Sequence, residues 1–244
     1  MNIGILGTGT ITSAVVEGIA ADGHVITVSE RSRARSADLA ARYDDVAAAG
    51  NQAVVDCSDV IFLGLMAETA PAVLADLSFR PDQRVITLMA GATLEEADAM
   101  VAPARAVAIM MPFPGIAQGG SPVMAQGDTV LIEEIFGASN TVFAVRDAAE
   151  MDAYLCAQAV LSPAVKLVDD AATWLGGRVR DPEQGEAFLR LLTGSSLLAA
   201  PCAEMLEALN TPGGYNQRLR QHMENARTGE ELHRGLDDLA VRQE

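Results

Sequence analysis

The fold follows from one segment, Asn2-Ile3-Gly4-Ile5-Leu6-Gly7-Thr8-Gly9-Thr10-Ile11-Thr12. Its apolar run predicts a strand, the glycines predict a tight turn, and a helix is expected from near Ile11. In such a unit the first glycine makes the turn and the second lets the backbone approach a pyrophosphate. That anion then rests on free N–H groups at the helix start. We therefore expect a dinucleotide phosphate site with contacts from Gly7, Thr8, Gly9, Thr10 and Ile11.

Outward from this segment, short apolar runs alternate with alanine-rich amphipathic stretches. The expected strands are Asn2–Leu6, Val25–Ser29, Val60–Leu65, Arg84–Met89, Ala106–Met110, Pro122–Ala125 and Thr141–Val145. The expected helices are Ile11–Ala21, Ser32–Tyr43, Ala67–Leu77, Thr93–Met100 and Thr129–Phe136. This alternation is typical of βα units that feed a parallel sheet. Residues 1–147 are therefore predicted to form an NAD(P)-binding α/β domain of the Rossmann type, with a doubly wound, mostly parallel sheet.

The pattern changes after Asp147, because no strand-like run follows and apolar residues recur at helical spacing. The expected helices are Ala149–Leu175, bent or broken near Pro163, and Pro182–Leu209, Pro212–Asn225 and Glu230–Val241. Segments such as 154–161 are apolar around much of the helix, which requires burial on more than one face. Residues 148–244 are therefore predicted to form an all-helical domain that makes a homodimer interface.

The end of the second expected strand reads Val28-Ser29-Glu30-Arg31-Ser32 and lies where a dinucleotide fold selects its ribose. Glu30 could accept a hydrogen bond from a ribose 2′-hydroxyl, which would favour NAD. Arg31, with Ser29 and Ser32, suits a 2′-phosphate, because a guanidinium binds phosphate through two parallel hydrogen bonds. Ser32 equally suits a solvated helix N-cap. We expect NADP as the cofactor, with NAD as the alternative.

The charge balance excludes several classes of partner. The 244 residues include 17 Lys and Arg against 33 Asp and Glu, a formal net charge of -16. This charge opposes binding to nucleic acids and anionic membranes. The three cysteines are far apart, so neither a disulfide framework nor a metal site is predicted. Since no stretch is apolar enough to span a membrane, we expect a cytoplasmic protein that acts on a small molecule.

Four stretches resemble the pyrroline-5-carboxylate reductase family, and the resemblance runs over essentially the whole chain. They are Ile3–Gly9, Ile86–Leu94, Met111–Gly115 and Thr211–Tyr215, the last reading Thr-Pro-Gly-Gly-Tyr. The resemblance implies an N-terminal Rossmann domain, a helical dimerisation domain and reduction of a cyclic imine carboxylate by NAD(P)H, as in proline biosynthesis. It also implies cofactor contacts at Leu65, Met66, Ala90, Gly91, Met111 and Pro112.

Several positions depart from the family pattern. Where the family has Met-Pro-Asn-Thr-Pro, this chain has Met111-Pro112-Phe113-Pro114, and the family's Lys-Pro becomes Met66-Ala67. The family's Ser-Gly-Ser-Gly-Pro-Ala becomes residues 158–164, and its Thr-Thr after the glycine pair becomes Tyr215-Asn216. The alignment implies Ser162, Tyr215 and Asn216 as candidates to orient the imine nitrogen. The resemblance therefore implies that the cofactor-binding residues are kept, and the differences imply that the substrate pocket has other residues than in the family.

The segment Thr211-Pro212-Gly213-Gly214 also has a direct chemical interpretation. Thr211 suits a helix N-cap and Pro212 the first helical position, so that Gly213, Gly214 and Tyr215 offer bare N–H groups. Such amides bind carboxylates as they bind phosphates. The segment predicts a binding site for a substrate carboxylate, and a plain turn between helices is the alternative.

Two other functions stay open. Lys166 is the only lysine of the chain and lies on an expected helix of the second domain. The β-hydroxyacid dehydrogenases carry Lys-x-x-Asn there, and Asp169 would replace the asparagine. An ion pair on the helix surface is the simpler interpretation of this spacing. The other function is that of a regulatory protein that binds the cofactor without catalysis, because family pocket residues are missing.

Overall fold

The computed structural model describes residues 1–241, and its packing forms two units. The first unit comprises Met1–Met151 and the second begins at Asp152. The sequence predicts a boundary after residue 147. The observed division lies slightly later, because the buried Met151 belongs to the first unit.

The first unit contains an eight-stranded sheet with helices on both faces. Its strands are β1 (Asn2–Leu6), β2 (Val25–Ser29), β3 (Val46–Ala49), β4 (Val60–Leu63), β5 (Arg84–Thr87), β6 (Arg105–Pro112), β7 (Pro122–Gly127) and β8 (Thr141–Ala144). Its helices are α1 (Thr10–Ile19), α2 (Arg33–Arg42), α3 (Asn51–Asp56), α4 (Ala70–Leu74), α5 (Leu94–Val101) and α6 (Thr129–Phe136). The short 3-10 helices η1 (Glu30–Ser32) and η2 (Pro114–Ala117) follow β2 and β6.

The strand order is β3-β2-β1-β4-β5-β6-β7-β8. Strands β1 to β6 pair in parallel, β7 runs antiparallel to β6, and β8 pairs in parallel with β7. The order therefore reverses between β1 and β4. In open α/β sheets ligands bind beyond the carboxyl ends of the strands at such a switch point. The predicted doubly wound, mostly parallel Rossmann fold is confirmed.

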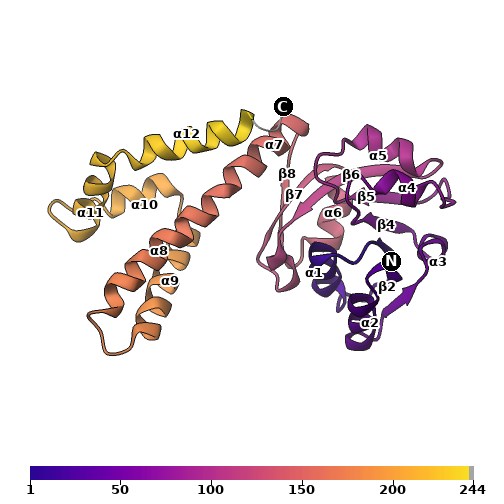
Figure 1. Ribbon diagram of the computed structural model, residues 1–244, viewed down its shortest axis with the longest axis horizontal. Coiled ribbons are helices and arrows are strands. Elements are labelled where there is room, and N and C mark those ends of the chain that lie inside the picture. The colour runs from indigo at the N-terminus through magenta and orange to yellow at the C-terminus, as the bar shows by residue number, and fades with distance from the viewer. Residues whose placement is uncertain (242–244) are drawn as a thin grey trace. The chain divides into compact units, whose positions relative to one another are not determined.

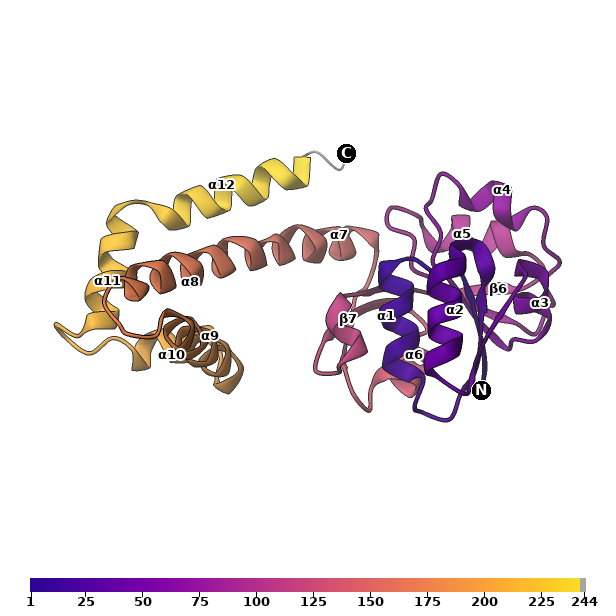
Figure 2. The same cartoon turned by 60° about the horizontal axis from the view of Figure 1, so that its bottom comes forward.

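Two helical layers enclose this sheet (Figures 1 and 2). Helices α1, α2 and α6 cover one face, where Val15 and Leu39 join the hydrophobic core. Helices α3, α4 and α5 cover the other face, where Val54 and Leu74 are buried. All four residues of β4 are completely buried, as expected of a central parallel strand covered on both sides.

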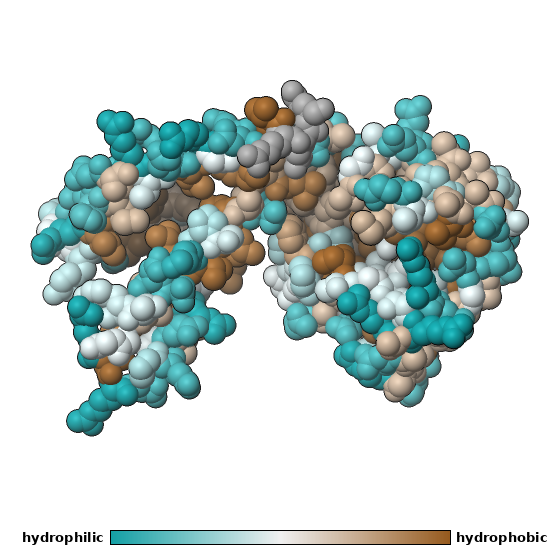
Figure 3. All heavy atoms as spheres, in the orientation of Figure 1, coloured by the Kyte–Doolittle hydropathy of each residue, from teal (hydrophilic) through white to brown (hydrophobic). Residues whose placement is uncertain are grey.

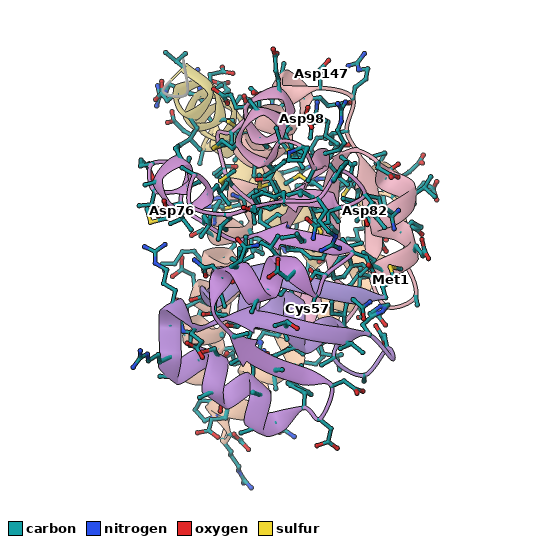
Figure 4. All side chains as sticks on the ribbon, turned by 90° about the vertical axis from the view of Figure 1, so that its right-hand side faces the viewer. Met1, Cys57, Asp76, Asp82, Asp98 and Asp147 are labelled. Carbon is teal, nitrogen blue, oxygen red and sulfur yellow. The ribbon has the colours of Figure 1, made fainter. Side chains whose placement is uncertain are left out.

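The two edges of the sheet are readily distinguished. Met1, Cys57 and Asp82, labelled in Figure 4, precede β1, β4 and β5 and mark the amino edge. The three cysteines of the chain are free. The loops that follow β1, β2, β4, β5 and β6 lie at the opposite, carboxyl edge, where the predicted cofactor residues are found.

Three segments of the first unit differ from the sequence prediction. β3 was not predicted because Val46-Ala47-Ala48-Ala49 has a single β-branched residue; it forms an edge strand by continuing the ladder of β2. α3, which begins two residues after β3 ends, was not predicted either. It is only six residues long, too short for a clear helical period. The helix expected over Ala67–Leu77 is shorter, and Pro71 lies in the first turn of α4, where its missing N–H is tolerated.

The second unit is helical. After α7 (Ala148–Ala157) and the 3-10 helix η3 (Gln158–Val160) come α8 (Leu161–Gly176), α9 (Pro182–Ala199), α10 (Cys202–Ala208), α11 (Tyr215–Asn225) and α12 (Thr228–Val241). The helix expected over Ala149–Leu175 breaks at η3, because Pro163 has no N–H to bond the carbonyl four residues back. The helix expected over Pro182–Leu209 is likewise interrupted before Pro201. Residues 242–244 of the predicted helical domain lie outside the described residues.

This unit has almost no hydrophobic core of its own. Of residues 152–241, only Cys156 and Gly185 are buried. Large apolar side chains are exposed instead, among them Leu198 at 90% and Leu191 at 73%. Figure 3 shows hydrophobic patches on the surface of this unit. An exposed apolar surface of this extent is typical of a protein interface.

None of the helices in residues 1–241 combines the length and the hydrophobicity of a membrane span.

Candidate functional site

The turn after β1 has a backbone that only glycine adopts without strain at its first position. Gly7 has φ +97°, in the left-handed region. A Cβ at this position would lie 2.4 Å from the carbonyl oxygen of Gly64, which follows β4. The Gly7 N–H donates to the Ser29 hydroxyl at 2.8 Å. The turn is therefore held between the ends of β2 and β4.

Gly9, the second glycine, faces open space. It precedes α1 with an extended backbone, φ −78° and ψ −176°, and no side chain caps the helix. A Cβ there would meet only the Thr12 hydroxyl, at 3.7 Å. The first turn of α1 contains no acidic residue, and its first N–H groups have no acceptor within the helix. This arrangement provides room and donors for an anion.

Thr12 occupies the place where dinucleotide folds usually have a third glycine or alanine for close helix–strand packing. Its hydroxyl donates to the Gly9 carbonyl at 3.2 Å. A Cβ at Gly64 would lie 2.0 Å from the Thr12 methyl group. The missing side chain at Gly64 thus makes room for Thr12, so α1 still packs closely on the sheet.

A pocket of about 330 Å³ opens beside this turn. Its lining residues are Gly7, Thr8, Gly9, Arg31, Ser32, Arg35, Gly64 and Met66. Arg31 and Arg35 are exposed and four residues apart, in η1 and α2. Within residues 1–241 neither guanidinium forms an ion pair with an acidic side chain. Two unpaired cations at one pocket of an acidic protein indicate a negatively charged ligand.

The structure revises how the residues after β2 contribute. Ser29 is completely buried, and its hydroxyl accepts a hydrogen bond from the Gly7 N–H. It therefore stabilises the glycine turn and is not exposed to a ligand. Glu30 is exposed and is not among the pocket's lining residues. Arg31 and Ser32 line the pocket together with Arg35. Their contact with a 2′-phosphate stays a prediction. Sequence reasoning missed Arg35, although its spacing of one helical turn from Arg31 was a usable signal.

The remaining predicted cofactor residues lie at the same carboxyl edge. Leu65 is buried and Met66 is 67% exposed, just after β4. Ala90 and Gly91 follow β5, and both are exposed. Met111 and Pro112 end β6 and are half-buried. Parallel strands bring these three loops together with the glycine turn, so one edge of the sheet carries every predicted cofactor residue.

The turn from Thr211 to Gly214 corrects one prediction. Thr211 is not a helix N-cap: α11 begins at Tyr215 and Gly214 precedes it as the N-cap. Gly213 has φ +74°, which is incompatible with a right-handed helix starting at Pro212. The Gly213 N–H donates to Gln217 Oε1 at 2.8 Å, and the Gly214 N–H donates to the Thr211 carbonyl at 3.0 Å.

Two of the three predicted amides are thus already engaged. The first amides of α11 itself, beginning with that of Tyr215, have no acceptor within the helix. The two candidate orienting side chains on α11 are accessible, because Tyr215 is 91% exposed and Asn216 is exposed. The part of this turn that remains open to an anion is therefore the start of α11.

Ser162 and Lys166 line a different cavity of the second unit. This groove of about 760 Å³ lies between α8 and α9 and also contains Arg190. Lys166 forms ion pairs with Asp170 and, at 3.6 Å, with Asp169. The hydrogen bond to Asp170 raises the pKa of the Lys166 ammonium, so this side chain stays charged at neutral pH. The geometry favours the ion-pair interpretation of Lys166.

Comparison with known proteins covers both units. Residues 2–91 match the family model described as NADP oxidoreductase coenzyme F420-dependent. No curated protein sequence matches the chain.

Among solved structures, the chain is similar to 1-pyrroline-5-carboxylate reductase from Streptococcus pyogenes, with a TM-score of 0.82 and 18% identity, covering 100% of this chain and 98% of that chain. The reductase from Coxiella burnetii gives a TM-score of 0.83 at 18% identity, covering 99% and 97%. The Plasmodium falciparum enzyme, solved with NADP bound, gives 0.80 at 14% identity, covering 100% and 97%. The chain therefore has the fold of the pyrroline-5-carboxylate reductases along its entire length.

Proposed function

We propose that this protein is a divergent member of the pyrroline-5-carboxylate reductase family, an NADPH-dependent enzyme that reduces the C=N bond of a cyclic imine carboxylate. The pocket at the β1/β4 switch point carries the proposal, because it combines an open glycine turn with two guanidinium groups that pair with no acidic side chain of residues 1–241. The family-model match over residues 2–91 and the three solved reductases support an NAD(P)-dependent oxidoreductase. Imine reduction in particular rests on the sequence resemblance.

The residues present fit a dinucleotide phosphate. The turn at Gly7 and Gly9 and the first amides of α1 would hold the pyrophosphate, with the space beside Gly9 left free by its missing side chain. Arg31, Ser32 and Arg35 would bind the 2′-phosphate and so favour NADP over NAD. The bound nicotinamide supplies the hydride, and no protein side chain needs to do so.

The second unit would hold the substrate. The open amides at the start of α11 offer donors for a carboxylate, despite the net negative charge of the chain. Ser162, Tyr215 and Asn216 are our candidates to fix the imine nitrogen through one hydrogen bond. An iminium is already an electrophile, so orientation matters more than strong acid–base catalysis.

A spectrophotometric screen tests this function. NADPH and NADH oxidation would be followed with pyrroline and piperideine carboxylates, and with 2-hydroxy acids in the reverse direction. We expect cyclic imine carboxylates to consume NADPH faster than NADH. Tight NADPH binding without turnover across the whole panel would instead indicate the regulatory alternative, because the cofactor would still stabilise the fold by ligand linkage.

The second unit further leads us to propose a homodimer. With only Cys156 and Gly185 buried among residues 152–241, its apolar helices need a second copy to cover them. We expect light scattering to give twice the 25.6 kDa chain mass. Leu198→Glu, at a side chain that is 90% exposed, should weaken the dimer strongly, whereas Glu204→Gln should leave it intact. A wild-type monomer at micromolar concentration would contradict this proposal.

We also propose that the protein is located in the cytoplasm. Its three free cysteines agree with a reducing compartment.

Substitution of Lys166 separates the imine reductase from the β-hydroxyacid dehydrogenase alternative. Lys166→Ala should leave turnover within about twofold of wild type, because the side chain is an exposed member of surface ion pairs. Steady-state kinetics of this variant would be compared with those of Asp169→Asn. A loss of several orders of magnitude in kcat for Lys166→Ala would move the assignment to the dehydrogenase class.

A further inference from the structure

A second cavity lies next to the cofactor pocket. This groove of about 440 Å³ is bounded by α1, α2 and η2. Arg35 is the residue that lines both the groove and the cofactor pocket. Two carboxylates, Glu17 from α1 and Asp38 from α2, line the same groove. The proposed phosphate-binding arginine therefore shares this groove with two acidic side chains.

Both acidic side chains are paired with a different arginine. Arg42 Nη1 lies 2.6 Å from Glu17 Oε1 and 3.2 Å from Asp38 Oδ2. The same guanidinium donates from Nη2 to the Tyr43 hydroxyl at 3.1 Å and lies 5.2 Å from the Tyr43 ring centre. The hydrogen bonds to Glu17 and then Asp38 raise the pKa of Arg42, so it remains charged. Arg42 is thus held by contacts on two sides while it pairs with both carboxylates.

The helical spacing shows why this pairing matters. Asp38 is three residues after Arg35 on α2, a spacing at which opposite charges pair on a helix surface. Without Arg42, Asp38 would be free to pair with Arg35, and Glu17 would lose its ion-pair partner in the same groove. Either change would oppose a phosphate group at Arg35, by direct competition or by repulsion.

We propose that Arg42 is a positioning residue for cofactor selectivity: by engaging Glu17 and Asp38 it keeps Arg35 available for the 2′-phosphate of NADPH. This inference rests on the proposed use of NADPH and adds a residue that does not itself line the pocket. It predicts that substitution of Arg42 weakens the binding of NADPH and does not change the binding of NADH, which has no 2′-phosphate.

Cofactor titrations of Arg42→Ala at low salt provide the first test. The dissociation constant for NADPH should rise about fivefold, as for the loss of partly exposed charge pairing, while that for NADH stays unchanged. Arg33→Ala is the matched control, because Arg33 is an exposed arginine of the same helix that lines neither cavity. An equal effect of both substitutions, or an equal loss of NADPH and NADH affinity, would overturn the inference.

A double-mutant cycle separates this pairing from a simple change in net charge. Asp38→Asn should restore most of the NADPH affinity in the Arg42→Ala background and change little in the wild-type background, where Asp38 is already paired with Arg42. If charge alone mattered, Asp38→Asn would tighten NADPH binding by the same factor in both backgrounds, and the proposal would fail. Arg42→Lys, which keeps the charge, should lie close to wild type.

Binding is measured here without turnover, so the outcome does not depend on the imine substrate. If wild-type protein binds neither cofactor, the proposed function fails. If it prefers NADPH and Arg42→Ala keeps that preference, only the role of Arg42 fails. Thermal unfolding of each variant without cofactor shows whether an affinity change follows from loss of the fold.

Discussion

Replacement of Gly9 by alanine is expected to weaken NADPH binding by about 100-fold while the folded chain remains intact. Gly9 has an extended backbone that alanine adopts without strain, and its Cβ would meet only the Thr12 hydroxyl at 3.7 Å. The added methyl group would therefore project into the pocket, where the pyrophosphate is expected to approach the backbone. Loss of two charge-assisted hydrogen bonds of about 1.5 kcal/mol each gives this factor.

Gly7→Ala is the matched control, because it should damage the fold itself. Gly7 has φ +97° and a Cβ there would lie 2.4 Å from the Gly64 carbonyl oxygen. We expect a loss of at least about 2 kcal/mol in unfolding free energy, from backbone strain plus this contact. Calorimetric titration with NADPH and chemical denaturation distinguish the two variants. Wild-type NADPH affinity in Gly9→Ala would show that the pyrophosphate does not lie on this turn.

Arg35→Ala is expected to weaken NADPH binding by about 10- to 100-fold and to leave NADH binding unchanged. Hydrogen bonds between a guanidinium and a phosphate contribute about 1.5–3 kcal/mol, and NADH has no 2′-phosphate to lose them. Arg31→Ala should behave in the same way, since both side chains line the pocket without an acidic partner in the described chain. The combined variant should lose nearly all preference for NADPH.

Fluorescence titrations with the two cofactors check this prediction, and NADH serves as the internal control. High salt should reduce the difference between NADPH and NADH in the wild type, because exposed charges are screened. Equal weakening for both cofactors would mean that Arg35 acts on the fold or on a shared phosphate. Glu30→Gln should have little effect on either titration, as its side chain is absent from the pocket lining.

The sheet was largely predictable because its signals are local. An apolar run followed by Gly7 and Gly9 specifies a strand, a left-handed turn and a helix start within a few residues, and the structure confirms that order. The parallel topology then brings the loops after β4, β5 and β6 to the same edge without further information. β3 escaped prediction because its alanines have no strand preference and pairing with β2 alone makes it a strand.

Other features of the site depend on contacts between distant segments. Thr12 breaks the usual small-residue pattern, and only the pairing of β1 with β4 reveals that Gly64 compensates for it. Ser29 resembled a phosphate ligand in sequence, yet its position beneath the turn makes it a structural acceptor for the Gly7 N–H. Arg35 lies one helical turn after Arg31, which is a weak sequence signal, and only the fold shows that both side chains line the pocket.

The helical unit was predictable in outline, and two details of the prediction were wrong: the uninterrupted helix over Pro182–Leu209 and the N-cap at Thr211. Long apolar segments predicted its helices, and the homodimer inferred from them stays a prediction. The N-cap assigned to Thr211 followed from residue preference alone. Gln217 changes the outcome by accepting the Gly213 N–H, which stabilises a separate turn before α11 begins. Such a side chain to backbone bond competes with the helix and leaves little trace in the sequence pattern.

A crystal structure grown with NADPH tests the central claim most directly. We predict pyrophosphate oxygens within hydrogen-bond distance of the amides at Gly9, Thr10 and Ile11, and the 2′-phosphate between the guanidinium groups of Arg31 and Arg35. NADPH bound elsewhere, or a Gly7–Gly9 turn without phosphate at saturating cofactor, would contradict the account.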